Sequence, residues 1–164
     1  MRLLKLFGVS IVIFGIVILG LSALFPSHVR ISRAVNIGAP MPKVQQGLGD
    51  LKKWQYWNNM TTQEDLTNKK FSDSSFASDQ MQVKLVSASP DLVLTKWNRN
   101  ENEVINSGFQ LVGAADSTVV QWYFDFTLKW YPWEKFGSII FDKQLGPSME
   151  SSLTRLKKFI EDNQ

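Results

Sequence analysis

One stretch decides the fold of this chain: Thr118-Val-Val-Gln-Trp-Tyr-Phe-Asp-Phe-Thr-Leu-Lys-Trp130. Every second position in it is apolar or aromatic, and these positions are Val120, Trp122, Phe124, Phe126, Leu128 and Trp130. The positions between them are largely polar, as Gln121 and Asp125 illustrate. Because side chains alternate between the two faces of a β-strand, this pattern predicts a long antiparallel strand with one face buried.

Three more strands are expected upstream of this stretch, over residues 81–88, 92–98 and 104–114. Short turns rich in Ser, Pro, Asp and Asn separate them, which is typical of consecutive hairpins. The same alternation directs a set of apolar side chains inward, namely Trp97, Ile105, Phe109 and Leu111. The four segments together indicate an antiparallel sheet with one apolar face.

Residues 30–37 indicate a first strand, which ends at a Gly-Ala-Pro turn. A short helix is expected over 43–48, and Asp50 is a candidate N-cap for a second one that carries Trp54. Residues 58–80 are polar and are expected to form a long loop or an irregular edge strand.

The C-terminal region carries an amphipathic pattern over residues 144–161. Its apolar positions recur at helical spacing, at Leu145, Met149, Leu153, Leu156 and Ile160. An apolar sheet face needs a cover, and this helix has the matching stripe. The expected fold is α+β, with a curved antiparallel sheet wrapped on a long C-terminal helix.

Residues 6–25 are uncharged and mostly apolar, and a helix of this length would span about 30 Å, the hydrocarbon thickness of a bilayer. A cleaved signal peptide is the alternative, but its apolar core is usually only about 7–15 residues long. We therefore expect a single-pass membrane protein with residues 1–28 as anchor and flank and residues 29–164 as the domain.

Orientation and self-association of the anchor rest on weaker patterns. Arg2 and Lys5 favour an N-terminus inside and an extracytoplasmic domain, although Arg30 and Arg33 lie equally close on the other side. Small residues recur every seventh position, at Gly8, Gly15 and Ser22. They favour weak self-association through the helix, unless they reflect the ordinary glycine content of membrane helices.

Charge and composition exclude several classes of function. Residues 1–33 carry four Lys or Arg and no acid, whereas the rest carries 14 bases and 15 acids. The domain thus lacks the basic surface of a nucleic-acid binder. The chain has no cysteine, and His28 is its only histidine. A cysteine nucleophile, a Ser-His-Asp triad and a thiolate or histidine-rich metal site are therefore excluded from the domain, and no cofactor is expected.

Carboxylates are the remaining candidates for acid–base chemistry, and they are Glu101, Glu103, Asp125, Glu134 and Asp142. No spacing among them brings two carboxylates together. The strand alternation directs Asp125 away from the buried face. The sequence therefore assigns no catalytic residue and favours a protein that is not an enzyme.

Several motifs in a fixed order resemble the SRPBCC superfamily, the START-like or helix-grip domains that include polyketide cyclase/dehydrase-type proteins. They are Val35-Asn-Ile-Gly-Ala-Pro40 with Val44, Asp50-Leu-Lys-Lys-Trp-Gln-Tyr-Trp-Asn58, Val119-Val-Gln-Trp122, and the helix segment from Ser148 to Phe159. The resemblance covers residues 30–162. It fails over residues 58–80, where the second strand of the family and its usual glycines are not found.

The resemblance implies a cavity between sheet and C-terminal helix that binds a lipid, polyketide, quinone or other apolar molecule, and only some members are enzymes. Candidate lining residues are Trp97, Phe109, Trp122, Phe124, Phe126, Met149 and Leu153. The same side chains would serve equally as packed core. Trp54 and Trp57 would either gate such a cavity or fix the short helices to the sheet.

Three functions follow from these patterns. The first is membrane-anchored binding of an apolar small molecule or lipid. The second is a cyclase, dehydratase or hydrolase that uses the same cavity, for which Asn98, Asn106 and Gln110 would be the polar groups to test. The third is an interaction module of a membrane complex, with the aromatic cluster Tyr131, Trp133 and Phe136 as its surface.

Overall fold

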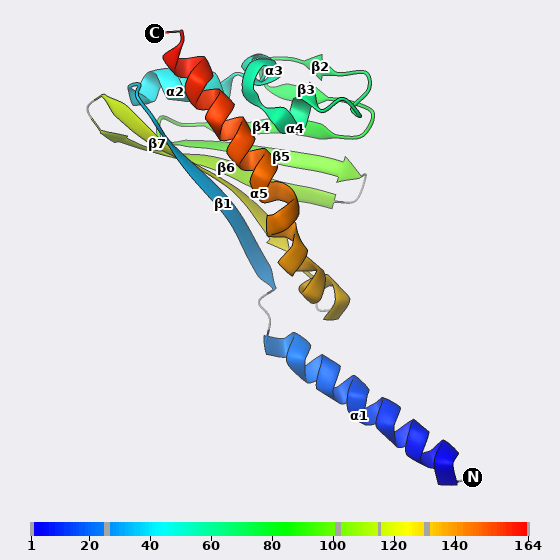
Figure 1. Ribbon diagram of the computed structural model, residues 1–164. Helices are drawn as coiled ribbons and strands as arrows, with labels where there is room; N and C mark the ends of the chain where they lie inside the picture. Colours follow the sequence, from blue (N-terminus) through cyan, green and yellow to red (C-terminus); the bar gives the residue numbers. More distant parts are fainter. Residues whose placement is uncertain (1, 25–26, 101–102, 115, 130–131, 164) are drawn as a thin grey trace.

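The computed structural model describes residues 2–24, 27–100, 103–114, 116–129 and 132–163. Its elements follow the order expected from the sequence, with one apolar helix before an α+β domain (Figure 1). The elements are α1 (Arg2–Leu24), β1 (His28–Ile37), α2 (Met41–Gly49), the 3₁₀ helix η1 (Leu51–Lys53), α3 (Trp54–Trp57), α4 (Asn59–Thr62), β2 (Lys70–Phe71), β3 (Ser75–Ala77), β4 (Gln82–Ala88), β5 (Leu92–Asn100), β6 (Glu103–Ala114), β7 (Ser117–Thr127) and α5 (Pro132–Glu161).

The strands form one antiparallel sheet in the order β1-β7-β6-β5-β4-β3-β2. The first strand therefore pairs with the last, and Ile31 lies opposite Phe124. Along β7 the alternation predicted from the sequence is confirmed, because Val120 and Trp122 have no exposed surface and Phe124 is 2% exposed. This strand supplies the centre of the buried face.

Of the two alternatives expected over residues 58–80, a long loop or an irregular edge strand, the structure shows short edge strands together with a helix that the sequence did not indicate. This segment holds the four-residue helix α4 and the strands β2 and β3, of two and three residues, which close the sheet edge. Strands this short give no measurable alternation, so composition alone could not separate them from loop. Asp50, by contrast, acts as an N-cap as predicted, since its Oδ1 accepts from Lys52 N at 3.0 Å.

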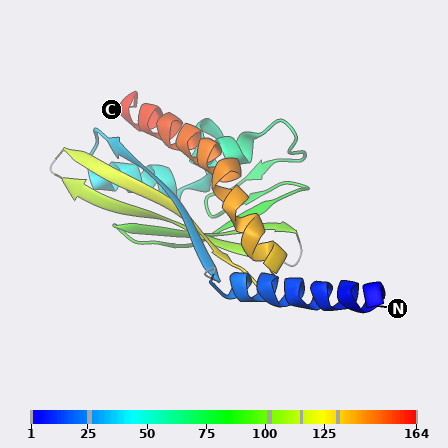
Figure 2. The same ribbon diagram turned by 60° about the horizontal axis from the view of Figure 1, so that its bottom comes forward.

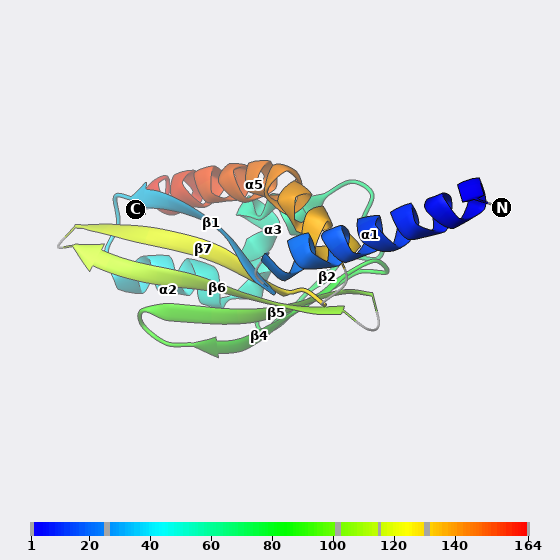
Figure 3. The same ribbon diagram turned by 90° about the horizontal axis from the view of Figure 1, so that it is seen from below.

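All the domain's helices lie on one side of the curved sheet, with α5 crossing it diagonally (Figures 1 and 3). The helix predicted over 144–161 is longer, because α5 begins at Pro132. Proline is well suited to a first helical position, where its missing N–H has no intrahelical partner. Pro147 inside the helix removes one hydrogen bond, and α5 bends in its middle part (Figure 3).

At the crossing of α5 over β1 lies Arg33, a half-buried residue on the covered face of β1 that contacts the helix. Its Nε donates to Glu150 Oε1 at 2.6 Å, and its Nη1 lies 2.9 Å from Asp142 Oδ1. Gly146 lies one turn from each acid, and a Cβ atom there would collide with the guanidinium. The glycine thus lets the helix approach the arginine closely.

Helix α1 projects from the domain at the end where β1 begins (Figure 2). It is the one helix among the described residues that is long and apolar enough to cross a membrane, by length and composition, with a mean hydropathy of 2.3 over Lys5–Ser22. Its large apolar side chains are exposed. Near its end Ser22 is 3% exposed, and α1 contacts α5.

Candidate ligand cavity

The space between sheet and helices is divided into a filled part and a hollow part. The filled part lies under α3, where Trp54 and Trp57 have no exposed surface. Their rings meet Phe109 edge-on, with centroids 5.7 and 6.1 Å apart, and Phe109 stacks on Trp122 at 4.9 Å. These two tryptophans therefore fix the short helices to the sheet, which is one of the two roles that the sequence left open for them.

Two of the three indole groups of this filled part are held by specific hydrogen bonds, whereas the buried Trp57 Nε1 has no hydrogen-bond partner among the described residues. Trp54 Nε1 donates to Leu48 O at 2.9 Å, and Trp122 Nε1 donates to Ser107 Oγ at 2.9 Å. Both acceptors belong to elements that pack around the rings, and Ser107 is 1% exposed. Because a buried indole N–H needs a partner, these bonds restrict each ring to one orientation and leave no room for a ligand there.

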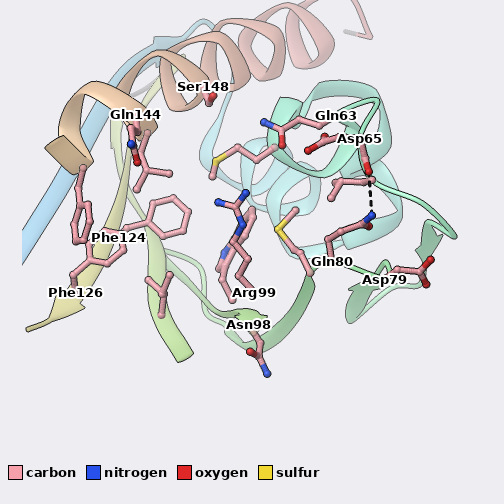
Figure 4. Close-up of a pocket in the computed structure, with 17 residues that line it drawn as sticks. Gln63, Asp65, Asp79, Gln80, Asn98, Arg99, Phe124, Phe126, Gln144 and Ser148 are labelled. Atoms are coloured by element: carbon pink, nitrogen blue, oxygen red, sulfur yellow. Dashed lines mark hydrogen bonds between the residues drawn. The ribbon is translucent and has the colours of Figure 1, made fainter. Parts of the chain in front are cut away.

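The hollow part is a cavity of about 550 Å³ at the other end of the sheet, between the ends of β5 and β7, the start of β6, and α5 (Figure 4). Its size lies within the range of roughly 300–1,000 Å³ that is usual for small-molecule sites. It is lined by Met60, Gln63, Asp65, Leu66, Asp79, Gln80, Met81, Trp97, Asn98, Arg99, Ile105, Phe124, Phe126, Phe141, Gln144, Leu145 and Ser148.

Apolar side chains form the deep wall of this cavity, and polar ones form its rim. Trp97, Phe124 and Phe126 are 4%, 2% and 9% exposed. Gln63, Gln80 and Gln144 are exposed at the rim. An apolar interior with a few polar groups at its edge is the composition typical of small-molecule sites.

Three ionisable residues line the cavity, and they differ in their partners. Asp79 is engaged, since its Oδ2 accepts from Thr67 Oγ1 at 2.8 Å and from Asn68 Nδ2 at 2.7 Å. Asp65 accepts a hydrogen bond from Gln80 Nε2 through its backbone oxygen, at 3.1 Å. The side chain of Arg99 makes no hydrogen bond or ion pair with any part of the chain that the structure describes.

The seven side chains predicted to line a cavity fall into two groups. Trp97, Phe124 and Phe126 lie on the wall of the hollow. The others are packed core that does not border it, namely Phe109, Trp122, Met149 and Leu153, each at most 2% exposed. Contact of any of them with a ligand stays a prediction.

The sequence did not find several lining residues, such as Met60, Leu66 and Met81. Met60 comes from α4 and Leu66 from the segment before β2, where no periodicity marks an inward position, whereas Met81 begins the predicted strand 81–88 with the parity of the buried Val83. Phe141 and Arg99 were missed for a different reason, because each lies just beyond the predicted limits of its element.

The polar groups suggested for an enzyme do not converge on the cavity. Asn106 and Gln110 are exposed on the outer face of β6, which corrects their expected place. Asn98 borders the cavity, but its amide points away from Phe124 and Phe126 (Figure 4).

The remaining residues predicted to have a functional role either lie away from the cavity or have side chains that the structure does not describe. Asp125 faces outward, as predicted, where its carboxylate accepts from Arg30 Nε at 2.6 Å, and the Arg30 guanidinium lies 4.2 Å from the Tyr123 ring centre. Several predicted positions lie outside the described side chains, and these are Glu101, Glu103, Tyr131, Trp133, Glu134 and Phe136. Among the side chains that are described, no group of three His, Asp or Glu is placed to hold a metal.

Comparisons with solved structures identify the fold. A START superfamily protein from Mycobacterium smegmatis matches with a TM-score of 0.58 and 16% identity, over 82% of this chain and 99% of the other. StfQ, a di-domain ARO/CYC from the steffimycin biosynthetic pathway, matches with a TM-score of 0.59 and 10% identity, over 83% of this chain and 52% of StfQ. DynU16, from the dynemicin biosynthetic locus, matches with a TM-score of 0.54 and 18% identity, over 85% of this chain and 49% of DynU16.

The chain thus has the START-like helix-grip fold expected from its motifs, and it spans about half the length of StfQ and DynU16. No family model matches the sequence. No curated protein sequence matches it significantly either. At these identities the likeness concerns the fold.

Proposed function

We propose that this protein binds an apolar small molecule or lipid in the cavity between its sheet and α5, while α1 anchors it in a membrane. The proposal assigns residues 1–28 to the anchor and its flank and residues 29–164 to the binding domain. The observation that carries it is the hollow of about 550 Å³ with a deep wall of Trp97, Phe124 and Phe126. Water in contact with such a wall is displaced favourably by an apolar ligand.

The position of the cavity relative to α1 supports a membrane-derived ligand. Only four chain steps separate Leu24 from His28, so the start of β1 lies within about 14 Å of the end of the helix. In the sheet, Val29 of β1 pairs with Phe126 of the cavity wall. Helix α5, which contacts α1, contributes Phe141 and Leu145 to the same cavity. A ligand leaving the bilayer at α1 would therefore have a short path.

An enzyme that uses the same cavity is the second candidate. It requires an ionisable group on the cavity wall, and Asp65, Asp79 and Arg99 meet that requirement. The description of StfQ as an ARO/CYC names one chemistry found on this fold. Binding remains the first proposal because the hydrogen bonds of Asp79 are taken up by Thr67 and Asn68.

Filling the cavity tests the proposal. The full chain in phosphatidylcholine nanodiscs is titrated with the neutral fluorescent probe N-phenyl-1-naphthylamine, with empty nanodiscs as background. Ile105→Trp adds a ring at a half-buried wall position and is expected to weaken probe binding roughly tenfold. Val104→Trp is the matched control. Val104 precedes Ile105 on β6, and its side chain is 58% exposed on the face of the sheet opposite the cavity.

The two variants must give different results for the proposal to stand. Equal probe binding by the wild-type chain and by both variants, with unchanged melting temperatures, would contradict a ligand in this cavity. Binding of a compound followed by its conversion to product would instead favour the enzyme.

A further inference from the structure

Arg99 places a positive charge at the mouth of an apolar cavity. On β5 the side chains of Val93, Thr95 and Trp97 are buried, and Arg99 is an exposed residue at a register shift between Asn98 and Asn100, where the strand borders the cavity. Figure 4 shows the guanidinium of Arg99 pointing into the space between the sheet and α5, toward the part of the cavity that Gln63, Gln144 and Ser148 also line. It is the one basic residue among the described residues that line this cavity.

The lack of an acidic partner distinguishes Arg99 from the other well-placed arginines. Arg30 is paired with Asp125, and Arg33 is paired with Asp142 and Glu150. Asp65 and Asp79 border the same cavity, yet neither carboxylate lies within 4 Å of Arg99. The five N–H donors of a guanidinium form a planar fork that fits a carboxylate or phosphate. Here that fork faces the cavity unoccupied by any side chain.

We propose that the ligand is a single-chain amphiphile whose anionic head, a carboxylate or phosphate monoester, binds Arg99. This inference rests on the proposed function and specifies its ligand. The chain would lie on Phe124, Phe126 and Ile105, which continue from Arg99 into the apolar part of the cavity. At about 30 Å³ per group, the volume of one liquid water, the cavity holds roughly 18 non-hydrogen groups, enough for one chain.

A pair of probes that differ only in the head tests this assignment. 10-Bromodecanoate and 10-bromodecan-1-ol share a chain whose bromine quenches tryptophan fluorescence, and Trp97 lies on the cavity wall. Each is titrated into the full chain in phosphatidylcholine nanodiscs. Because hydrogen bonds to charged groups are about twice as strong as neutral ones, the carboxylate is expected to bind roughly tenfold more tightly than the alcohol.

Two substitutions on the same strand identify the residue responsible. Arg99→Gln is expected to abolish the preference for the carboxylate while leaving the affinity for the alcohol unchanged. Lys96→Gln removes the same charge from an exposed side chain on the opposite face of β5, and it should preserve the preference. Each variant removes one positive charge, so any effect of protein charge on partitioning of the probes into lipid is the same for both. A difference in probe affinity between the two variants therefore reports on the cavity.

The outcomes separate this inference from the proposed function. Equal affinities of the wild-type chain for acid and alcohol, or a carboxylate preference that survives in Arg99→Gln, would overturn the anionic head while leaving apolar binding intact. Quenching by neither compound would overturn the proposed function itself. If inorganic phosphate competed with 10-bromodecanoate as effectively as decyl phosphate does, the site would be one for a free anion. That result would overturn the proposal that the ligand is an amphiphile.

Discussion

Arg33 and Glu150 lie 117 positions apart in the sequence, and their side chains meet, with Arg33 Nε donating to Glu150 Oε1 at 2.6 Å. The same guanidinium binds Asp142 two helical turns earlier and lies over Gly146 between them. One side chain of the first strand thus joins two turns of the last helix to the sheet at their crossing, beside the buried stripe of Met149 and Leu153. The hollow lined by Phe141, Gln144 and Leu145 begins beside this crossing.

Gly146→Ala is expected to destabilise the protein by about 1–2 kcal/mol, because the new methyl group collides with the Arg33 guanidinium. At an unobstructed helix position the same change stabilises by about 0.5–1 kcal/mol. In an Arg33→Ala background Gly146→Ala should therefore become stabilising. Urea unfolding of the four proteins gives the coupling energy, and additive effects would contradict the contact.

Asp142 is expected to make stability depend on acid pH. The hydrogen bond from Arg33 is the main cause that holds the pKa of Asp142 below its usual value. An aspartate with a lowered folded-state pKa binds fewer protons when folded than when unfolded, so its contribution is present above about pH 4 and is lost as pH falls further.

The comparison that checks this is the melting temperature between pH 6 and pH 3. Between these pH values the melting temperature of the wild-type chain should fall further than that of Asp142→Asn. The difference between the two proteins should shrink at high salt, because the Asp142 side chain is 58% exposed. Parallel curves for the two proteins would show that the pair contributes nothing to folding.

Trp54→Ala is expected to cost about 3–5 kcal/mol, since it empties a fully buried site and leaves Leu48 O without its donor. Tyr56→Ala, two residues away, is the control. Tyr56 is 64% exposed and only stacks on Phe159, so its loss should cost less than about 1.5 kcal/mol. Similar unfolding free energies for both variants would argue against a packed aromatic core at this end of the sheet.

The anchor and its orientation can be tested with single cysteines, because the chain has none of its own. Ser87→Cys places a thiol on an exposed part of β4, and Ser10→Cys places one within α1. With the N-terminus inside, a membrane-impermeant maleimide should label Ser87→Cys in intact cells and leave Ser10→Cys unlabelled.

Labelling of Ser87→Cys only after lysis would place the domain in the cytoplasm. Release of the chain by alkaline carbonate, or a mass that lacks the residues of α1, would contradict the anchor and favour a cleaved signal peptide.

Local periodicity explains why the sequence determined so much of this fold. The alternation along Val120, Trp122 and Phe124 follows from the two-residue repeat of a strand, and the stripe through Met149 and Leu153 follows from the helical repeat. Both signals arise within a single segment. They therefore predicted the long strands and the C-terminal helix, while the uncharged apolar run of residues 6–25 predicted the candidate span of α1 and the order of motifs indicated the START-like fold.

The boundaries of the cavity needed tertiary structure, because a void is the space that side chains from several elements leave between them. Phe109 and Phe124 both point inward from neighbouring strands, two register positions apart, yet one is packed against Trp54 and the other borders the hollow. What separates them is the placement of α3 over one end of the sheet and the bend of α5 over the other. No residue pattern within a single strand carries that information, so the sequence supplied the inward-facing aromatic residues and only the packing of the helices decided which of them border a cavity.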